Sequence, residues 1–77
     1  MISERLGKVI LRELKLDAFP LQDDTTANQV PGWDSLSHVR IITAVEAEFG
    51  VRFRPLEVIR LKNVGDLQKA VDHKLGA

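Results

Sequence analysis

Apolar side chains recur every three or four residues in three separate stretches of this chain. The stripes are Leu6, Val9, Ile10 and Leu14; Leu36, Val39, Ile42, Val45 and Phe49; and Val64, Leu67, Val71 and Leu75. This spacing is typical of amphipathic helices, and no segment shows the strict alternation of a half-buried strand. The pattern therefore predicts an all-α fold.

The residues at the ends of these stripes set the expected helix bounds. Ser3, Asp34 and Asn63 are good N-caps, and Gly50 stands where a C-cap glycine belongs. Pro55 suits the first turn of a further short helix. We expect helices over about residues 3–15, 35–49, 55–61 and 64–75. The prediction is a small four-helix bundle, with three main helices and one short one, in a single domain over residues 1–77.

The first connection between helices is unusually long. Residues 17–33 hold two prolines, a glycine and a cluster of Asp, Thr and Asn, so we interpret them as one ordered loop. Phe19, Leu21 and Val30 are expected to hold this loop against the core, and Trp33 to pack it onto the start of the second main helix. Loops of this length in a compact domain are often functional.

Composition excludes several classes of protein. The chain has 77 residues, no cysteine and 5% aromatic residues, so its core must be aliphatic and no disulfide or thiolate metal site supports it. Eleven basic and eleven acidic residues give zero net charge, which argues against a nucleic-acid binder. No apolar run reaches about 18 residues, and the N-terminus is charged. We expect a cytoplasmic monomer without membrane insertion.

Ser35 raises the main functional question. If Asp34 is the N-cap, Ser35 is the first helical residue, where backbone N–H groups lack intrahelical partners. Those N–H groups and the positive end of the helix dipole favour an attached phosphate. Taken alone, however, the Asp-Ser pair is more typical of an ordinary helix start, since short motifs often match by accident.

A hydrolytic triad is the competing chemistry. Ser35 and His38 are three residues apart on a helix, so their side chains can meet. Asp34 is nevertheless poorly placed to orient the far nitrogen of His38, and the Gly-x-Ser-x-Gly elbow is missing. We therefore expect no enzyme activity, His38 as a surface residue beside Ser35, His73 as a solvated residue, and no metal site.

The segments "GWDSLSHVRIITAVEAEFGVRF" and "LKNVGDL" resemble the acyl carrier protein family. Asp34-Ser35-Leu36 is similar to the site where that family carries its phosphopantetheine arm. Glu46, Glu48, Phe49 and Gly50 match the end of its second helix; Val64, Gly65, Asp66 and Leu67 match the start of its last; and "ISERLGKVI" resembles its first helix. The resemblance covers nearly the whole chain and implies an acyl-carrier-protein-like bundle.

The resemblance also implies a function. Ser35 would bear the phosphopantetheine arm as a substrate of a phosphopantetheinyl transferase, and acyl- or aminoacyl-loading and condensing enzymes would use the cargo, as in fatty acid biosynthesis or other lipid metabolism. Asp34 would help to engage the transferase and its magnesium. The residues assigned to partner binding are Asp34, Leu36, Arg40, Thr43 and Glu46. An aminoacyl or peptidyl carrier of the same fold and a helical interaction module without a prosthetic group remain as alternatives.

Two further expectations concern the second half of the chain. An acyl chain would be sheltered by Val39, Ile42, Val45, Ile59 and Leu61, although simple core packing of these residues is the preferred interpretation. The sequence also departs from the acidic surface of the family: residues 34–62 hold four acids against five bases, among them Arg40, Arg52, Arg54 and Arg60. Because charge complementarity sets partner choice, we expect a specialised carrier with dedicated partners.

Overall fold

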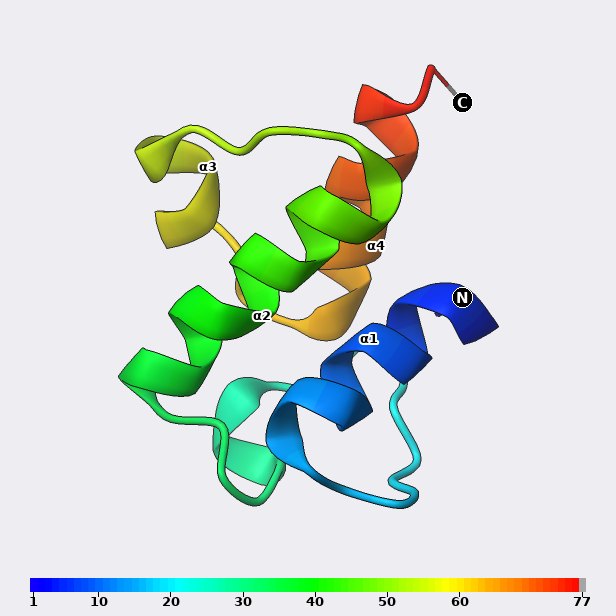
Figure 1. The fold of residues 1–77 in the computed structure, drawn as a ribbon, viewed down its shortest axis with the longest axis vertical. Helices are drawn as coiled ribbons and strands as arrows, with labels where there is room; N and C mark the ends of the chain where they lie inside the picture. Colours follow the sequence, from blue (N-terminus) through cyan, green and yellow to red (C-terminus); the bar gives the residue numbers. More distant parts are fainter. Residues whose placement is uncertain (77) are drawn as a thin grey trace.

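A computed structural model describes residues 1–76 and is helical throughout its regular structure. Its elements are α1 (Glu4–Leu14), a 3₁₀ turn η1 (Ala27–Gln29), α2 (Ser35–Phe49), α3 (Pro55–Ile59) and α4 (Val64–Lys74). Figure 1 shows α1 and α4 beside α2, with the short α3 on the side of α2 away from α1. The described residues contain no strand. The prediction of an all-α four-helix fold with a long first loop is confirmed.

The three predicted N-cap residues all cap their helices through side-chain hydrogen bonds. The Ser3 Oγ accepts a hydrogen bond from the Leu6 N–H at 3.2 Å. The Asp34 and Asn63 side chains accept bonds from the N–H groups three residues ahead, both at 2.8 Å. Each cap satisfies a backbone donor that the helix itself leaves free.

The C-terminal ends differ slightly from the prediction. Gly50 ends α2 in the left-handed conformation at φ 67°. Helix α3 ends at Ile59, two residues before the predicted bound of 61. Asn63, the N-cap of α4, has extended backbone at φ −150° and ψ 175°.

The core is aliphatic, as expected, but α2 contributes a different face from the predicted stripe. Its buried residues are Ile41, Ile42 and Val45, whereas Leu36 and Val39 are both 61% exposed. The predicted stripe advanced mostly in steps of three, and three residues turn a helix by about 300°. Such a stripe drifts around the helix by about 60° per step, so its first members lie outside the core face.

The long loop is held against the start of α4. Val30 and Thr25 are buried, and Leu21 packs on the core. The Thr25 carbonyl accepts a hydrogen bond from the Val64 N–H at 2.8 Å, and the Asp23 carbonyl accepts one from the Gly65 N–H at 2.9 Å. The backbones approach so closely that a Cβ on Gly65 would lie 2.6 Å from the Asp23 oxygen. The loop is therefore ordered, and Gly65 makes its contact with α4 possible.

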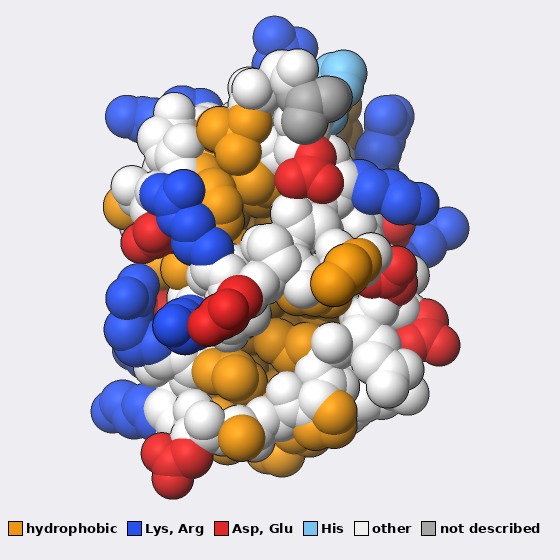
Figure 2. Space-filling model, turned by 90° about the vertical axis from the view of Figure 1, so that its right-hand side faces the viewer, with side chains coloured by type: hydrophobic (Ala, Val, Ile, Leu, Met, Phe, Trp, Pro, Cys, Tyr) orange, Lys and Arg blue, Asp and Glu red, His pale blue; other side chains and the backbone are white. Residues whose placement is uncertain are grey.

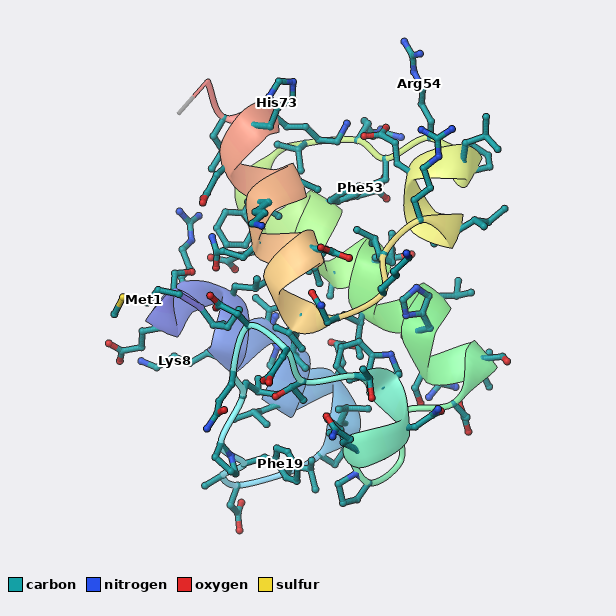
Figure 3. All side chains as sticks on the ribbon, turned by 180° about the vertical axis from the view of Figure 1, so that it is seen from behind. Met1, Lys8, Phe19, Phe53, Arg54 and His73 are labelled. Carbon is teal, nitrogen blue, oxygen red and sulfur yellow. The ribbon has the colours of Figure 1, made fainter. Side chains whose placement is uncertain are left out.

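Two cation–aromatic contacts join the helices at the periphery. Arg5 of α1 pairs with Glu48 at 2.7 Å and lies 4.6 Å from the centre of the Phe49 ring. Lys74 of α4 pairs with Glu57 of α3 and lies 5.2 Å from the Phe53 ring. Figure 3 shows Phe53 on the inner side of this corner, while Arg54 projects away from the body.

The charged surface is mixed on the face shown in Figure 2. There, acidic and basic side chains are interspersed around small apolar patches. Among the described residues, no helix has the length and apolar character needed to cross a bilayer.

Candidate functional site

A tight turn delivers the chain to the start of α2. The Val30 carbonyl accepts a hydrogen bond from the Trp33 N–H at 3.2 Å, and Gly32 between them has φ 80°. Proline in the second position and a left-handed residue in the third are the requirements of a type II turn, and Pro31-Gly32 supplies both. The buried Val30 anchors this turn, so the position of Ser35 is fixed by the core.

Asp34 fixes the first turn of α2 and carries a charge there. Its carboxylate accepts the Ser37 N–H, and that hydrogen bond, with others from the same turn, lowers the pKa of Asp34 below its usual value. A carboxylate held in this way stays ionised next to the positive end of the helix dipole. It therefore presents a fixed negative charge immediately before Ser35.

Ser35 begins α2 with an exposed side chain. Its hydroxyl has no hydrogen-bond partner within residues 1–76. The backbone N–H groups of Ser35 and Leu36 have no intrahelical acceptors, whereas that of Ser37 is bonded to Asp34. An attached phosphodiester would find these donors and the helix dipole on one side and open space on the other. The site thus fits a phosphate-linked group.

Trp33 and His38 form a hydrogen-bonded pair beside Ser35. The Trp33 Nε1–H donates to the His38 Nδ1 at 3.1 Å, with the ring centroids 6.1 Å apart. Trp33 packs against the core, which confirms that it ties the loop to α2. His38 is half-buried rather than fully at the surface, and this burial lowers its pKa.

The same contacts disfavour a catalytic triad. Because the His38 Nδ1 accepts from Trp33, the ring proton of neutral His38 is on the Nε2, which cannot take the proton of Ser35. The Asp34 carboxylate is bonded to the Ser37 N–H and forms no hydrogen bond with the His38 ring. No group of three metal-ligating side chains lies within residues 1–76.

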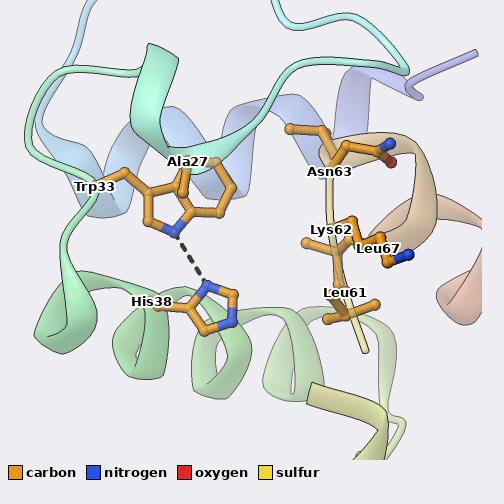
Figure 4. Close-up of a pocket in the computed structure, with 8 residues that line it drawn as sticks. Ala27, Trp33, His38, Leu61, Lys62, Asn63 and Leu67 are labelled. Atoms are coloured by element: carbon orange, nitrogen blue, oxygen red, sulfur yellow. Dashed lines mark hydrogen bonds between the residues drawn. The ribbon is translucent and has the colours of Figure 1, made fainter. Parts of the chain in front are cut away.

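Ser35 is one of the residues that line an open groove of about 700 Å³. The groove is also lined by Trp33, Asp34 and His38 at the start of α2, by Ala27 and Asn28 of η1, and by Val58, Ile59 and Leu61 in and after α3. A smaller cavity of about 30 Å³ continues inward past Trp33, His38 and Leu61 to Val64 and Leu67 (Figure 4). A cavity of that size holds about one water molecule.

The residues predicted to shelter an acyl chain divide into two groups. Ile42 and Val45 are core residues, as the preferred interpretation held, but Val39 and Ile59 are 61% and 76% exposed, so core packing is wrong for these two. Ile59 and half-buried Leu61 line the groove beside Ser35. Sequence analysis missed Asn28 and Val58 as lining residues, because only the folded loop and α3 bring them to α2.

The residues assigned to partner binding are spread along α2. Leu36 and Arg40 are exposed near the Ser35 end, and Arg40 lines a shallow groove with Thr43. The Thr43 hydroxyl donates to the Val39 carbonyl at 3.0 Å. Glu46 is half-buried, and its carboxylate accepts the Phe53 N–H at 2.8 Å, so it holds the segment between α2 and α3 in place.

The described residues thus form a four-helix domain with an exposed serine at the start of its second main helix. The family described as "Phosphopantetheine attachment site" matches residues 4–71. The chain is 34% identical over 75 residues to an acyl carrier protein of Helicobacter pylori (strain G27), covering 96% of each. It is 28% identical over 76 residues to one of Phenylobacterium zucineum (strain HLK1), covering 99% of this chain and 96% of the relative.

A solved structure agrees with these relatives. The solution structure of holo acyl carrier protein from Geobacter metallireducens superposes with a TM-score of 0.87 at 38% identity, covering 92% of this chain and 82% of that one. The chain belongs to the phosphopantetheine-binding acyl carrier protein family. It is a non-catalytic carrier with phosphopantetheine as its covalent group, and family members work with a phosphopantetheinyl transferase and acyl-handling enzymes.

Proposed function

We propose that Ser35 is the attachment residue and that this protein carries acyl groups as thioesters on an arm joined to its hydroxyl. The observation that carries the proposal is the exposed hydroxyl of Ser35, free of hydrogen bonds to the described residues, at the first position of α2 and among the residues that line a groove. The relatives named above are acyl carrier proteins, which favours acyl over aminoacyl cargo.

The attachment chemistry needs little from this chain. The Ser35 oxygen forms a bond to the phosphorus nearest the pantetheine of coenzyme A, the pyrophosphate bond to the adenosine bisphosphate breaks, and a base of the transferase takes the hydroxyl proton. Asp34 presents its charge to the transferase. The arm supplies a thiol for thioester formation, and because the chain has no cysteine, cargo meets no competing thiol.

The surface around the groove supports dedicated partners. Three of the four acids of residues 34–62 are engaged internally: Glu46 binds the Phe53 N–H, Glu48 pairs with Arg5 and Glu57 pairs with Lys74. The fourth, Asp34, caps α2 but stays exposed. The basic side chains Arg40, Arg52, Arg54 and Arg60 are exposed and form no salt bridge to any described residue.

The excess of free basic side chains favours partner enzymes whose docking surfaces are less basic than those of enzymes that use acidic carriers. We therefore propose a specialised carrier. We also place it in the cytoplasm, which the lack of cysteine permits.

The test of attachment is an intact-mass measurement after incubation with coenzyme A, magnesium and a broad-specificity phosphopantetheinyl transferase. The wild type should gain one arm, and Ser35→Ala should gain none. Ser37→Ala is the matched control, since it alters a serine of the same helical turn and should still gain the arm. Loading of Ser35→Ala would overturn the assignment.

A further inference from the structure

The Trp33–His38 hydrogen bond fixes which ring nitrogen of His38 carries the proton in the groove beside Ser35. An indole nitrogen is a donor only, so the His38 Nδ1, 3.1 Å away, must accept and carries no proton. In a neutral imidazole the proton then resides on the Nε2. The pair therefore leaves His38 with one N–H donor of defined direction.

This donor faces the groove and has no partner within the described chain. Figure 4 shows the second ring nitrogen of His38 on the Leu61 side of the ring, away from Trp33. Both His38 and Leu61 line the open groove that Ser35 also lines and the inner cavity behind it. No hydrogen bond from the His38 Nε2 to residues 1–76 is present, whereas the Nδ1 is bonded.

The residues around this N–H donor favour one kind of hydrogen-bond acceptor. Four residues that line the inner cavity offer no side-chain hydrogen bond: Ala27, Leu61, Val64 and Leu67. Lys62 and Asn63 also line it, but the Asn63 Oδ1 already accepts the Asp66 N–H. A polar N–H beside apolar walls favours an acceptor oxygen whose own neighbours are apolar. A carbonyl oxygen within an alkyl chain meets that description, and the inner cavity of about 30 Å³ is too small to take a whole chain out of the groove.

From this geometry we propose that His38, oriented by Trp33, is a recognition residue that donates through its Nε2–H to a carbonyl oxygen of the arm attached at Ser35. The proposal rests on attachment at Ser35. The occupant is the arm itself, because Ser35, its point of attachment, lines the groove. Two carbonyl sources exist on a loaded arm: the amides of the pantetheine and the thioester of the cargo.

The test uses the full-length protein labelled with ¹⁵N and compares its apo, holo and hexanoyl-loaded forms, the last made from hexanoyl-coenzyme A. Long-range ¹H–¹⁵N correlation reports each histidine ring, and the chain has only two histidines. In the apo form, His38 should show the Nε2–H tautomer. Its ring signals should then shift on loading, while those of His73, exposed on α4, stay in place.

The two loaded forms identify the source of the oxygen. A shift already present in the holo form assigns an amide of the arm, and a shift that appears only in the hexanoyl form assigns the thioester. Trp33→Phe keeps an aromatic ring but removes the indole donor, so His38 should become a mixture of tautomers and shift less on loading. His73→Gln should leave the His38 response unchanged.

Two outcomes would overturn the proposal: a His38 ring that does not respond in either loaded form, or an apo protein whose His38 proton is on the Nδ1. Intact mass separates such a failure from failure of attachment. If the mass shows the arm present while His38 is silent, attachment at Ser35 stands and the recognition role is wrong.

Discussion

At the scale of single residues, the groove depends on a histidine that must stay neutral. Protonated imidazole has no acceptor nitrogen, so a proton on His38 breaks its bond to Trp33. Burial lowers the pKa of His38 below its usual value of 6.5. Of the charged residues lining the same groove and cavity, Asp34 favours the protonated form and Lys62 opposes it.

A stability difference with pH follows from this shift. The folded pKa of His38 lies below the unfolded value, so the unfolded chain binds the proton more readily. The contribution of His38 is therefore fully present above about pH 6.5 and is lost as the pH falls through that value toward the folded pKa.

We predict two consequences. The fluorescence emission of Trp33, the only tryptophan, changes as His38 gains a proton, and the midpoint temperature of thermal unfolding falls as the contribution of His38 to stability is lost. His38→Phe should remove this pH response and His73→Phe should keep it. A wild-type unfolding midpoint that does not fall relative to that of His38→Phe as the pH is lowered below about 6.5 would contradict the account.

At the scale of elements, the contact between the long loop and α4 is the one that least tolerates an added side-chain atom. A Cβ on Gly65 would lie 2.6 Å from the Asp23 carbonyl oxygen, and neither backbone can move without breaking its hydrogen bond. Gly65→Ala should lower the free energy of unfolding by about 1–3 kcal/mol.

Gly7→Ala is the matched control, because the added methyl would meet only the Leu21 side chain at 4.0 Å. It lies within α1 and should leave stability unchanged or raise it by up to about 1 kcal/mol, since alanine favours helix. Urea unfolding of both variants measures the difference. Equal effects of the two substitutions would show that the loop contact does not constrain residue 65.

The elements also show how far sequence reasoning reaches. Helix starts at Ser3, Asp34 and Asn63 were predictable, because capping is local chemistry. The inward face of α2 was not, since steps of three residues left its rotation ambiguous: Leu36 and Val39 belong to the predicted apolar stripe but are exposed. The pairing of Thr25 with Val64 and the position of Val58 in the groove arise from contacts between distant segments, which no local pattern encodes.

At the scale of the whole molecule, the charge that the surface offers to partners depends on which charged side chains already have partners within the chain. The chain is neutral, yet most of its free charges between Asp34 and Lys62 are arginines, because three of the four acids there are bound internally. A surface of this sign slows the encounter with enzymes that carry basic docking patches.

We predict that Arg40→Glu and Arg54→Glu raise kcat/KM for a malonyl transferase that serves acidic carriers, and that high salt reduces the gain. Lys69→Glu makes the same change in charge at an exposed position of α4 and should raise kcat/KM less. An equal gain from Lys69→Glu would mean that net charge, and not this surface, sets the rate.

The most direct measurement of the carrier role is the intact mass of the protein purified from the cells that naturally make it, before and after treatment with hydroxylamine. We predict a mass above that of the chain by one phosphopantetheine arm, with the arm localised to Ser35, and a cargo that hydroxylamine removes because it is held as a thioester. A protein with the mass of the bare chain, or with the arm on any other residue, would contradict the account.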